Sequence, residues 1–600
     1  MPTHSHVLAH LLSDDHARVH NAASVHASMT VMPGVLTQGY EVRGGWTPPN
    51  HHAVLDSHLT TLYEKAKKQL EGYETALVER KRKAALLSDG KKMENGHPCV
   101  NFVYGNEDGT MYCANVDTFG KSKTGEWYAE EIKKIIERNG NSVPLVILDS
   151  AGECGLARKI LRKWRKTLTT GACATHTLDL LFDDICKLDR FKKMLGTARV
   201  ITKVVRNHTK LHAHYVENGG TAIDKWSDTR QVAAMYMVLS LKRNMPKLVA
   251  LVLSDVFKKW GQSKHKRKTT DYDPMQGTAG QGKTNEQLAG IVQKAVQSTE
   301  FWQEVDIFIT VLEKIYATLR ANDSEVPGTP DIYFRMSSGL ADLQTNEWEL
   351  PDGTAFKFSP AERKVVLDAY KQRWDMLYNR LHALGLVLNP LLHSKHKFDG
   401  TCMVETRQYI DAYFASESDK AARCHQQLDN FRDKKGEFHG DGAMWSTYLH
   451  GPHRLSPISW WRRHAIMSRE LLEIAECSLP MPTSIGSSER VWKVFAWIQC
   501  KKRNRLEQER ASQLAHVHWS LRYHSRQADP CYEELILPDV TENPMYSTDD
   551  VWQGANSDIS DASNSEDAED EQEQHEHEDQ DEDEDEDEHA RLISFLKECN

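Results

Sequence analysis

The sequence predicts an α/β protein in which a small mixed sheet precedes a much longer all-helical region. Between residues 84 and 166, short apolar runs with strand periodicity alternate with helical patterns, an order typical of a sheet covered by helices. Beyond about residue 190, the hydrophobic spacing is helical. The chain has 600 residues, 40% of them hydrophobic, so it can bury the cores of two or more domains.

The first elements alternate in period. The segment 48–83 has apolar residues at helical spacing and begins at a pair of prolines, which predicts a long helix. Residues 84–89 form a short apolar run that ends at Asp89. The next elements are strands at 97–105 and 109–117 joined as a hairpin, a helix at 125–140 stopped by Asn-Gly, a buried strand at 143–149 ending in Asp149, and a helix at 155–166. We therefore expect mixed strand pairing, with an acid at the end of two strands.

The later part of the chain predicts helices. Long helical patterns occupy residues 232–260, 301–323 and 361–388. Two late segments, 459–482 and 487–524, are compatible with renewed α/β packing. The apolar face of this late region includes Leu506, Leu514, Val517 and Leu521, which suit a helix-packing stripe.

The charge of the chain is distributed unevenly. The net charge is −11, but residues 556–589 hold 19 acids and no Lys or Arg, so the rest of the chain is basic by 8. A basic body beside a polyanionic tail is typical of a nucleic-acid-binding protein whose tail competes for the basic surface. The alternative is a tail that only increases solubility.

Other features of the composition exclude some classes of protein. No apolar run is long enough to span a bilayer, so we expect no membrane partner. The eleven cysteines include no CxxC pair, and this unpatterned set predicts reduced thiols in the cytosol or nucleus.

Asp89 and Asp149 are placed where they can share metal ions. Carboxylates at the ends of neighbouring strands suit Mg²⁺ or Mn²⁺, and a third acid completes a two-metal site for phosphodiester transfer. Glu489, in the Ser-Ser-Glu-Arg that opens a predicted helix, is the best candidate for that third acid. The chain carries 86 acids, so the alternative is that both aspartates only form turns at strand ends.

Several blocks of the sequence occur in the order of one known family. They are LLSDG (86–90), VILDSAGECGLARKIL (146–161), GACATHTLDLLFDDICKL (171–188), RVITKVVRNHTKL (199–211), the stretches 301–336 and 373–393, and the segment 458–522 with its Ser-Ser-Glu-Arg. Together they span roughly residues 48–525 and resemble the hAT transposase superfamily, specifically a branch described as a domain of unknown function with an RNase H-like fold.

The resemblance implies an RNase H-like mixed sheet interrupted by a large all-α insertion. It also implies a division of the chain. The parts are a poorly ordered segment (1–45), the first part of the catalytic core (46–190), the all-α insertion domain (191–455), the end of the core with a dimerisation region (456–525), and a linker with an acidic disordered tail (526–600).

The resemblance also assigns roles to residues. In the family, two Asp and one Glu bind two metal ions, cut DNA at the transposon ends, leave hairpins on the flanking DNA and join the freed ends to a target. The matching positions are Asp89, Asp149 and Glu489, with Mg²⁺ or Mn²⁺ as cofactor. Cys173 and His176 match a CxxH block expected to shape the site.

Three further positions have a structural alternative. Trp226, in DKWSDT, matches a family Trp thought to stack on a displaced base, but most of the fifteen Trp residues are expected in the core. His176, taken alone, is more typical of a core or capping residue. Cys173 and His176 resemble half of a zinc site, and no second pair lies at zinc spacing, so we do not expect zinc there.

Two basic clusters are candidate DNA contacts. The first, Lys-His-Lys-Arg-Lys at 264–268, lies in a polar loop and suits phosphate contact, nuclear import or a solvated surface. The second follows the Glu489 helix, where we expect phosphate contact. With Arg490 beside the glutamate, its members are Lys501, Lys502, Arg503 and Arg505.

The sequence departs from the family in two places. Lys91 and Lys92 follow Asp89-Gly90, where the family usually has Trp. No cysteine precedes Cys99, so we do not expect the family's usual N-terminal zinc finger.

Two readings of function remain. The first is a nuclear, metal-dependent DNA transposase that acts on transposon ends and target DNA as a homodimer or higher oligomer. The second is a domesticated, catalytically inactive dimeric nuclear DNA-binding, scaffold or regulatory protein. A general RNase H-like nuclease is less favoured because it needs no large helical insertion.

Overall fold

The computed structural model describes residues 58–93, 95–226, 232–263, 284–393, 400–439, 444–445, 455–499 and 506–528. The predictions for residues 1–45 and for the acidic tract lie outside these ranges. No helix within them is long and apolar enough to cross a membrane.

A mixed sheet forms the centre of the fold, as the sequence predicted, and it has five strands. Its strands lie in the order β3-β2-β1-β4-β5. The pairs β1–β2 and β2–β3 are antiparallel, and the pairs β1–β4 and β4–β5 are parallel. This arrangement is compatible with an RNase H-like fold. The elements up to the last strand are α4 (Leu59–Glu79), β1 (Ala85–Lys92), β2 (Pro98–Asn106), β3 (Gly109–Asp117), α5 (Gly125–Asn139), β4 (Leu145–Leu148), α6 (Gly152–Trp164) and β5 (Thr169–Ala172).

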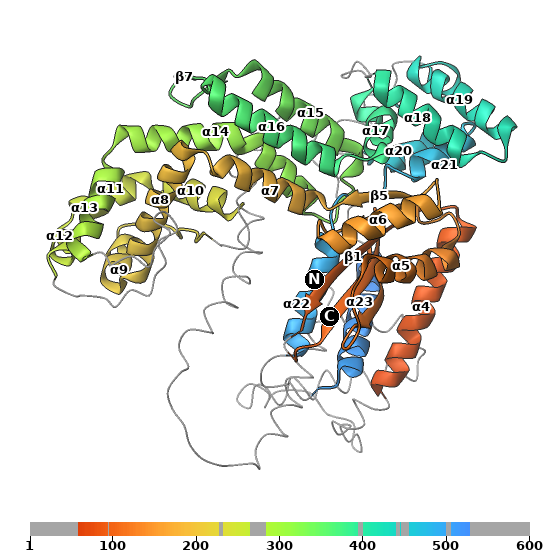
Figure 1. Ribbon diagram of the computed structural model, residues 1–600, viewed down its shortest axis with the longest axis horizontal. Helices are drawn as coiled ribbons and strands as arrows, with labels where there is room; N and C mark the ends of the chain where they lie inside the picture. The colour runs from red at the N-terminus through yellow and green to blue at the C-terminus, as the bar shows by residue number, and fades with distance from the viewer. Residues whose placement is uncertain are drawn as a thin grey trace, which may run out of the picture.

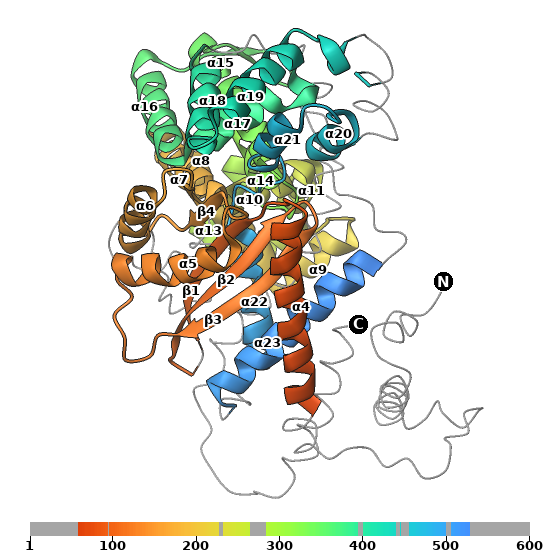
Figure 2. The ribbon, with the colours of Figure 1, turned by 90° about the vertical axis from the view of Figure 1, so that its right-hand side faces the viewer.

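Both faces of the sheet are buried because apolar side chains alternate along β1. Leu86 points to the face covered by α5 and α6, whereas Ala85 and Leu87 point to the opposite face. That opposite face packs against α22 (Gly486–Ile498) and α23 (Gln508–Ala528), which come from the end of the described chain. Figure 2 shows α22 and α23 beside the sheet together with α4.

A long helical region separates β5 from α22. Its first part has its own core, and α8 to α13 extend away from the sheet as an arm (Figure 1). These elements are α7 (Ala174–Cys186), α8 (Asp189–Asn207), α9 (Thr209–Glu217), α10 (Ala233–Arg243), α11 (Met245–Leu253), α12 (Asp255–Gly261), α13 (Asn285–Val296), α14 (Thr299–Asn322), α15 (Thr329–Thr345), β6 (Trp348–Glu349), β7 (Ala355–Phe356) and α16 (Pro360–Leu377).

The second part of the helical region shares a core with the sheet. Its helices lie above the sheet in Figure 1 and contribute to the same apolar cluster as Leu87 and Ile147. They are α17 (Arg380–Leu388), η2 (Pro390–Leu392), α18 (Gly400–Tyr413), α19 (Ser418–Arg432), η3 (Gly436–Phe438), α20 (Pro457–His464) and α21 (Arg469–Glu476). The insertion is therefore joined to the sheet by packing as well as by the chain.

The structure adds strands that the sequence pattern did not reveal. The fifth strand, β5, is Thr-Thr-Gly-Ala, which is too short and too polar to show strand periodicity. The two-residue strands β6 and β7 lie inside the region predicted as all helical. The late segments compatible with α/β packing are helical wherever residues 455–499 and 506–528 have regular structure.

The buried histidines make the stability of the fold sensitive to acid. Burial lowers the pKa of His382 to about 3 and that of His516 to about 4. His382 is in the first turn of α17, where its Nδ1 accepts a hydrogen bond from the backbone nitrogen of Asn379 at 3.4 Å. His516 meets Tyr63 and Tyr112 edge-on, with ring centroids 5.4 and 5.1 Å away.

We expect the His382→Gln variant to lose less stability on acidification than the wild type. The unfolded chain binds a proton at each histidine below about pH 6.5, whereas the folded chain keeps His382 neutral, so stability falls as the pH falls. Between pH 7.5 and 5.5 this costs the wild type about 1.4 kcal/mol for each such histidine. Urea unfolding at both pH values measures the difference. The exposed His212→Gln variant is the control, and an unchanged pH dependence in His382→Gln would refute the assignment.

Candidate active site at the carboxyl ends of the parallel strands

Three predicted site residues lie at the same level, Asp89 within β1 and Asp149 and Cys173 just after β4 and β5. The register pairs Leu87 of β1 with Ile147 of β4, and Leu148 of β4 with Ala172 of β5. Continuing this register places Asp89 beside Asp149 and Asp149 beside Cys173. Adjacent strands are about 4.8 Å apart, so the three residues form one row along the sheet edge.

The sequence suggested that Asp89 ends its strand, but in the structure Asp89 lies inside β1. The strand continues to Lys92 because it pairs with β2 along its full length, whereas its pairing with β4 stops at Leu87. Asp89 therefore lies beyond the parallel pairing but is still held in the sheet. Its Oδ2 accepts a hydrogen bond from Trp492 Nε1 at 2.8 Å, and its Oδ1 accepts one from the Gly90 nitrogen at 2.8 Å.

Asp149 and Glu489 meet at one imidazole ring. His176, in the first turn of α7, has its Nδ1 3.0 Å from Asp149 Oδ1 and its Nε2 3.3 Å from Glu489 Oε1. The side chain of Glu489 is 19% exposed and that of Asp149 is 39% exposed, so the opening of the site lies on the aspartate side. The structure thus brings Glu489, which is distant in the sequence, to the end of β4 where Asp149 lies.

The beginning of α22 is fastened to the sheet by buried contacts. Cys173 Sγ accepts a hydrogen bond from the backbone nitrogen of Ile485 at 3.3 Å, and the Ala174 nitrogen donates to the oxygen of Thr483 at 2.9 Å. On the other side, Asn101 Nδ2 donates to the backbone oxygen of Ser488 at 2.8 Å. These contacts set the position of the helix turn that carries Glu489.

The charges of the site are partly compensated. Burial raises the pKa of Asp89, although the hydrogen bond from Trp492 acts against this. The contact with His176 lowers the pKa of Asp149, and the same contact raises the pKa of His176 to about 11. The imidazole is therefore a cation between two carboxylates. Because α7 and α22 both begin here, their N-terminal backbone amides also favour negative charge.

The residues present suit divalent cations. Three carboxylates at one edge provide the oxygen ligands that Mg²⁺ and Mn²⁺ prefer. Ligand atoms of Cys173, His176 and Glu489 also lie within 4.8 Å of one another, a second way to hold an ion. The buried Cys173 thiol, however, already accepts from Ile485 and contacts Thr175 Oγ1 at 3.0 Å. The oxygen set is thus the better metal site.

Two site residues were not identified from the sequence. Asn101, which is fully buried on β2, binds both the Asp89 nitrogen and Ser488, and Trp492 holds Asp89. Trp492 had a usable signal, because residues three positions apart share a helix face and Trp492 follows Glu489 by three. Asn101 had none, because its partners are distant in the sequence.

Arg490 and Trp226 contact the helical region. Arg490 Nη1 donates to the backbone oxygen of Asp323 at 3.1 Å. Trp226 packs against the core of the arm, and the Arg199 guanidinium lies 4.7 Å from its ring centroid. Both side chains have structural partners, so their roles in DNA binding and base stacking stay predictions. The cluster formed by Lys501, Lys502, Arg503 and Arg505 and the basic segment 264–268 lie outside the described residues.

The predicted helix-packing stripe is used within the chain. Leu514 and Val517 of α23 are buried in the core that includes β1, and Leu506 and Leu521 pack against it. The stripe is not available to a partner in this structure, and self-association stays a prediction.

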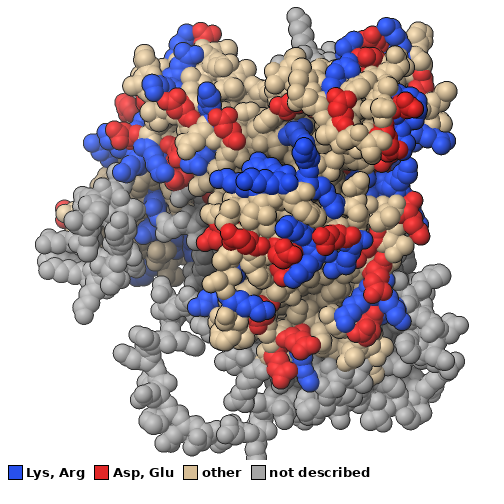
Figure 3. Space-filling view, turned by 45° about the vertical axis from the view of Figure 1, so that its right-hand side comes forward, with Lys and Arg blue, Asp and Glu red and all other residues tan. Residues whose placement is uncertain are grey.

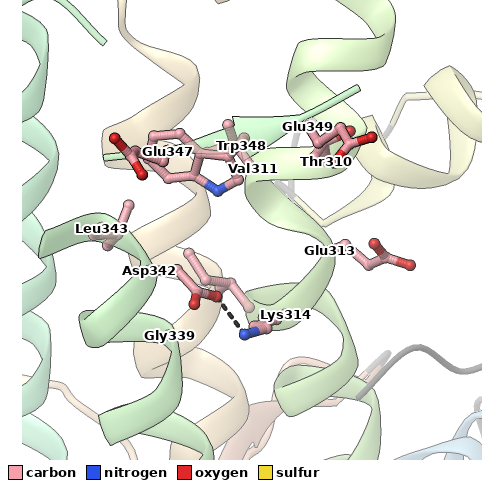
Figure 4. A pocket seen from close by; sticks show the side chains of 11 residues that line it. Thr310, Val311, Glu313, Lys314, Gly339, Asp342, Leu343, Glu347, Trp348 and Glu349 are labelled. Atoms are coloured by element: carbon pink, nitrogen blue, oxygen red, sulfur yellow. Dashed lines mark ion pairs between the residues drawn. The ribbon is translucent and has the colours of Figure 1, made fainter. Parts of the chain in front are cut away.

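A separate cavity lies in the helical region. It measures about 260 Å³, is bordered by α14, α15 and the β6–β7 hairpin, and contains an ion pair between Lys314 and Asp342 (Figure 4). None of the predicted site residues lines it. The candidate active site is therefore the open edge of the sheet and not this cavity.

The sequence comparison agrees with this placement. Residues 49–201 match the family described as Domain of unknown function (DUF659). This family is associated with hAT-like transposases. The matched part of the chain includes all five strands of the sheet with Asp89, Asp149 and His176, whereas Glu489 lies outside it. No curated protein matches the chain.

We expect Asn101→Ala to destabilise the protein by about 2–3 kcal/mol, because it leaves buried groups of Asp89 and Ser488 without their partner. Asn115 lies directly opposite on β3, and its amide nitrogen has no hydrogen-bond partner among the described residues. Asn115→Ala is the matched control and should cost less than about 1 kcal/mol. Urea unfolding followed by tryptophan fluorescence measures both. Equal losses would show that the contact with α22 contributes little.

Proposed function

We propose that this chain is the catalytic-core portion of a hAT-type DNA transposase that cuts and joins DNA at transposon ends. The observation that carries the proposal is the meeting of Asp149 and Glu489 at His176 beside Asp89. Residues from three separate parts of the sequence are held at one edge by buried contacts, and strand-end turn formation alone does not require this. The association of the matched family with transposases supports the same reaction.

Asp89, Asp149 and Glu489 would hold two Mg²⁺ or Mn²⁺ ions. Such ions activate an attacking oxygen and stabilise the leaving oxygen of a phosphodiester. The chain contributes the positions of the ligands. Trp492 orients Asp89 by its hydrogen bond, and the start of α22 positions Glu489.

His176 has a positioning role in this proposal. Its imidazolium neutralises part of the carboxylate charge and keeps Asp149 and Glu489 turned toward each other. Cation binding to the same oxygens competes with this contact. The proposed partners are transposon-end and target DNA and a second copy of the chain, and the proposed location is the nucleus.

We expect calorimetric titration with Mn²⁺, in the presence of a short DNA duplex, to show two bound ions for the wild type and none for Asp89→Asn/Asp149→Asn. Removing two of the three anionic ligands leaves too few oxygen charges for a hard cation. Asp255→Asn/Asp368→Asn removes the same charge at side chains 84% and 66% exposed and is the matched control.

Two results would overturn the assignment in different ways. Binding that persists in the Asp89/Asp149 variant would place the ions elsewhere. A well-folded wild type that binds no Mn²⁺ would favour the inactive DNA-binding or scaffold protein as the function.

We expect the affinity for Mn²⁺ to rise about tenfold per pH unit between pH 6 and 8.5, with release of one proton per site. The pKa of His176 is raised to about 11 by its contact with Asp149, so the ring is protonated throughout this range and competes with the cation. A cation that displaces the imidazolium lets the ring release its proton, so binding is coupled to proton loss and the affinity rises with pH. In His176→Gln the slope should disappear, whereas equal slopes in both proteins would show that the ion does not displace the imidazolium.

A further inference from the structure

An exposed aromatic pair lies on the turn after β3. Phe119 is 63% exposed and is the aromatic one among the exposed large apolar side chains of the described residues. Its ring stacks on His97, with centroids 4.4 Å apart and planes at 19°. We call these two side chains the aromatic platform. The free face of Phe119 is presented to solvent.

The platform is held rigidly by its neighbours. Asp117 Oδ1 accepts a hydrogen bond from the Phe119 nitrogen at 2.8 Å, and Asp117 Oδ2 lies 2.7 Å from His97 Nδ1. Between them, the buried Thr118 donates from its nitrogen and its hydroxyl to the Pro98 oxygen, at 2.8 and 2.7 Å. These hydrogen bonds hold the turn in the conformation that leaves Phe119 exposed.

The platform and Asp89 lie at the same end of the sheet, where the carboxyl ends of β1 and β3 are found. Strands β1 and β3 both run antiparallel to β2, so their carboxyl ends meet at one edge. The turn also folds back toward the acid, because a Cβ added to Gly90 would lie 3.5 Å from Lys123 Nζ. Figure 2 shows the loop after β3 passing along this edge to α5.

Four lysines without acidic partners among the described residues lie close to the platform in the sequence or in the strand register. Lys91 and Lys92 end β1, and Lys121 and Lys123 follow Phe119. None of the four forms an ion pair within the described part of the chain. Figure 3 shows that, on the face it draws, basic and acidic side chains mostly lie next to each other in bands. These four lysines can contact the phosphates of a polyanion that lies on the platform.

We propose that the aromatic platform stacks an unpaired base of a DNA strand at the Asp89 edge, while the four lysines contact its phosphates. Aromatic faces and basic side chains are the combination that binds single-stranded nucleic acid, and each stacked base contributes about 1–3 kcal/mol. The proposal rests on the proposed function and adds a strand-binding site to it. It also accounts for Lys91 and Lys92, which depart from the family pattern.

The test uses the full chain in EDTA and a 20-nucleotide single strand containing 2-aminopurine, with a blunt duplex of the same sequence as the second probe. Phe119→Ala should weaken single-strand binding at least about fivefold, remove the quenching of 2-aminopurine, and change duplex binding less than twofold. Phe119→Trp should restore both. Val365→Ala, at a side chain 50% exposed on α16, is the control.

The lysines have their own readout. Lys91→Gln/Lys92→Gln should reduce the slope of log affinity against log salt for the single strand by about 1.4, which corresponds to two phosphate contacts. An unchanged slope would remove these lysines from the proposal.

Failure of this inference is distinguishable from failure of the proposed function. If Phe119→Ala binds and quenches as the wild type does, the platform is wrong, whatever the result of Mn²⁺ titration. If Phe119→Ala loses quenching while the wild type binds no Mn²⁺, the platform stands and the catalytic assignment fails.

Discussion

The attachment of the first turn of α22 to the sheet is the contact on which the candidate site depends. Glu489 lies on α22, which packs on β1 and β2. The hydrogen bond from Asn101 to Ser488 joins residues that are 387 positions apart in the sequence. The Cys173 thiol and the Ala174 nitrogen hold the same segment from the side of β5 and α7. Because these partners are buried, losing one leaves polar groups without compensation, and the turn has little freedom to shift. The large helical insertion can therefore separate the acids in sequence without separating them in space.

The electrostatics of the site follow from that geometry. Carboxylates gathered at one partly buried edge repel one another, and the protein limits the cost with a cationic His176, the Trp492 hydrogen bond and two helix N-termini. The effects differ between the acids: burial raises the pKa of Asp89, whereas His176 lowers that of Asp149. In the proposed function, a divalent metal ion replaces the His176 imidazolium as the cation beside these carboxylates.

The candidate metal ligands and the aromatic platform lie at the same end of the sheet. Asp89 and Asp149 lie near the carboxyl ends of β1 and β4, and the aromatic platform lies just after the carboxyl end of β3. In the proposed binding mode, one DNA strand contacts the platform beside Asp89. The first part of the helical region has a core of its own, and its arm, α8 to α13, extends away from the sheet. The fold thus separates the region that carries the acids from a region free to serve another contact.

The sequence by itself determined the elements whose hydrophobic period is clear. Strands β1 to β4, helices α5 and α6 and the long insertion helices all follow from local spacing, and the resemblance singled out Asp89, Asp149 and Glu489. Local spacing missed β5, because four residues of Thr-Thr-Gly-Ala acquire strand geometry only from pairing with β4. It predicted Leu514 and Val517 as part of a helix-packing stripe but not what covers that stripe, and the tertiary structure packs both residues into the core that includes β1. Asn101, Trp492 and the His97–Phe119 stack depend on contacts between distant residues, so only the folded chain decided them.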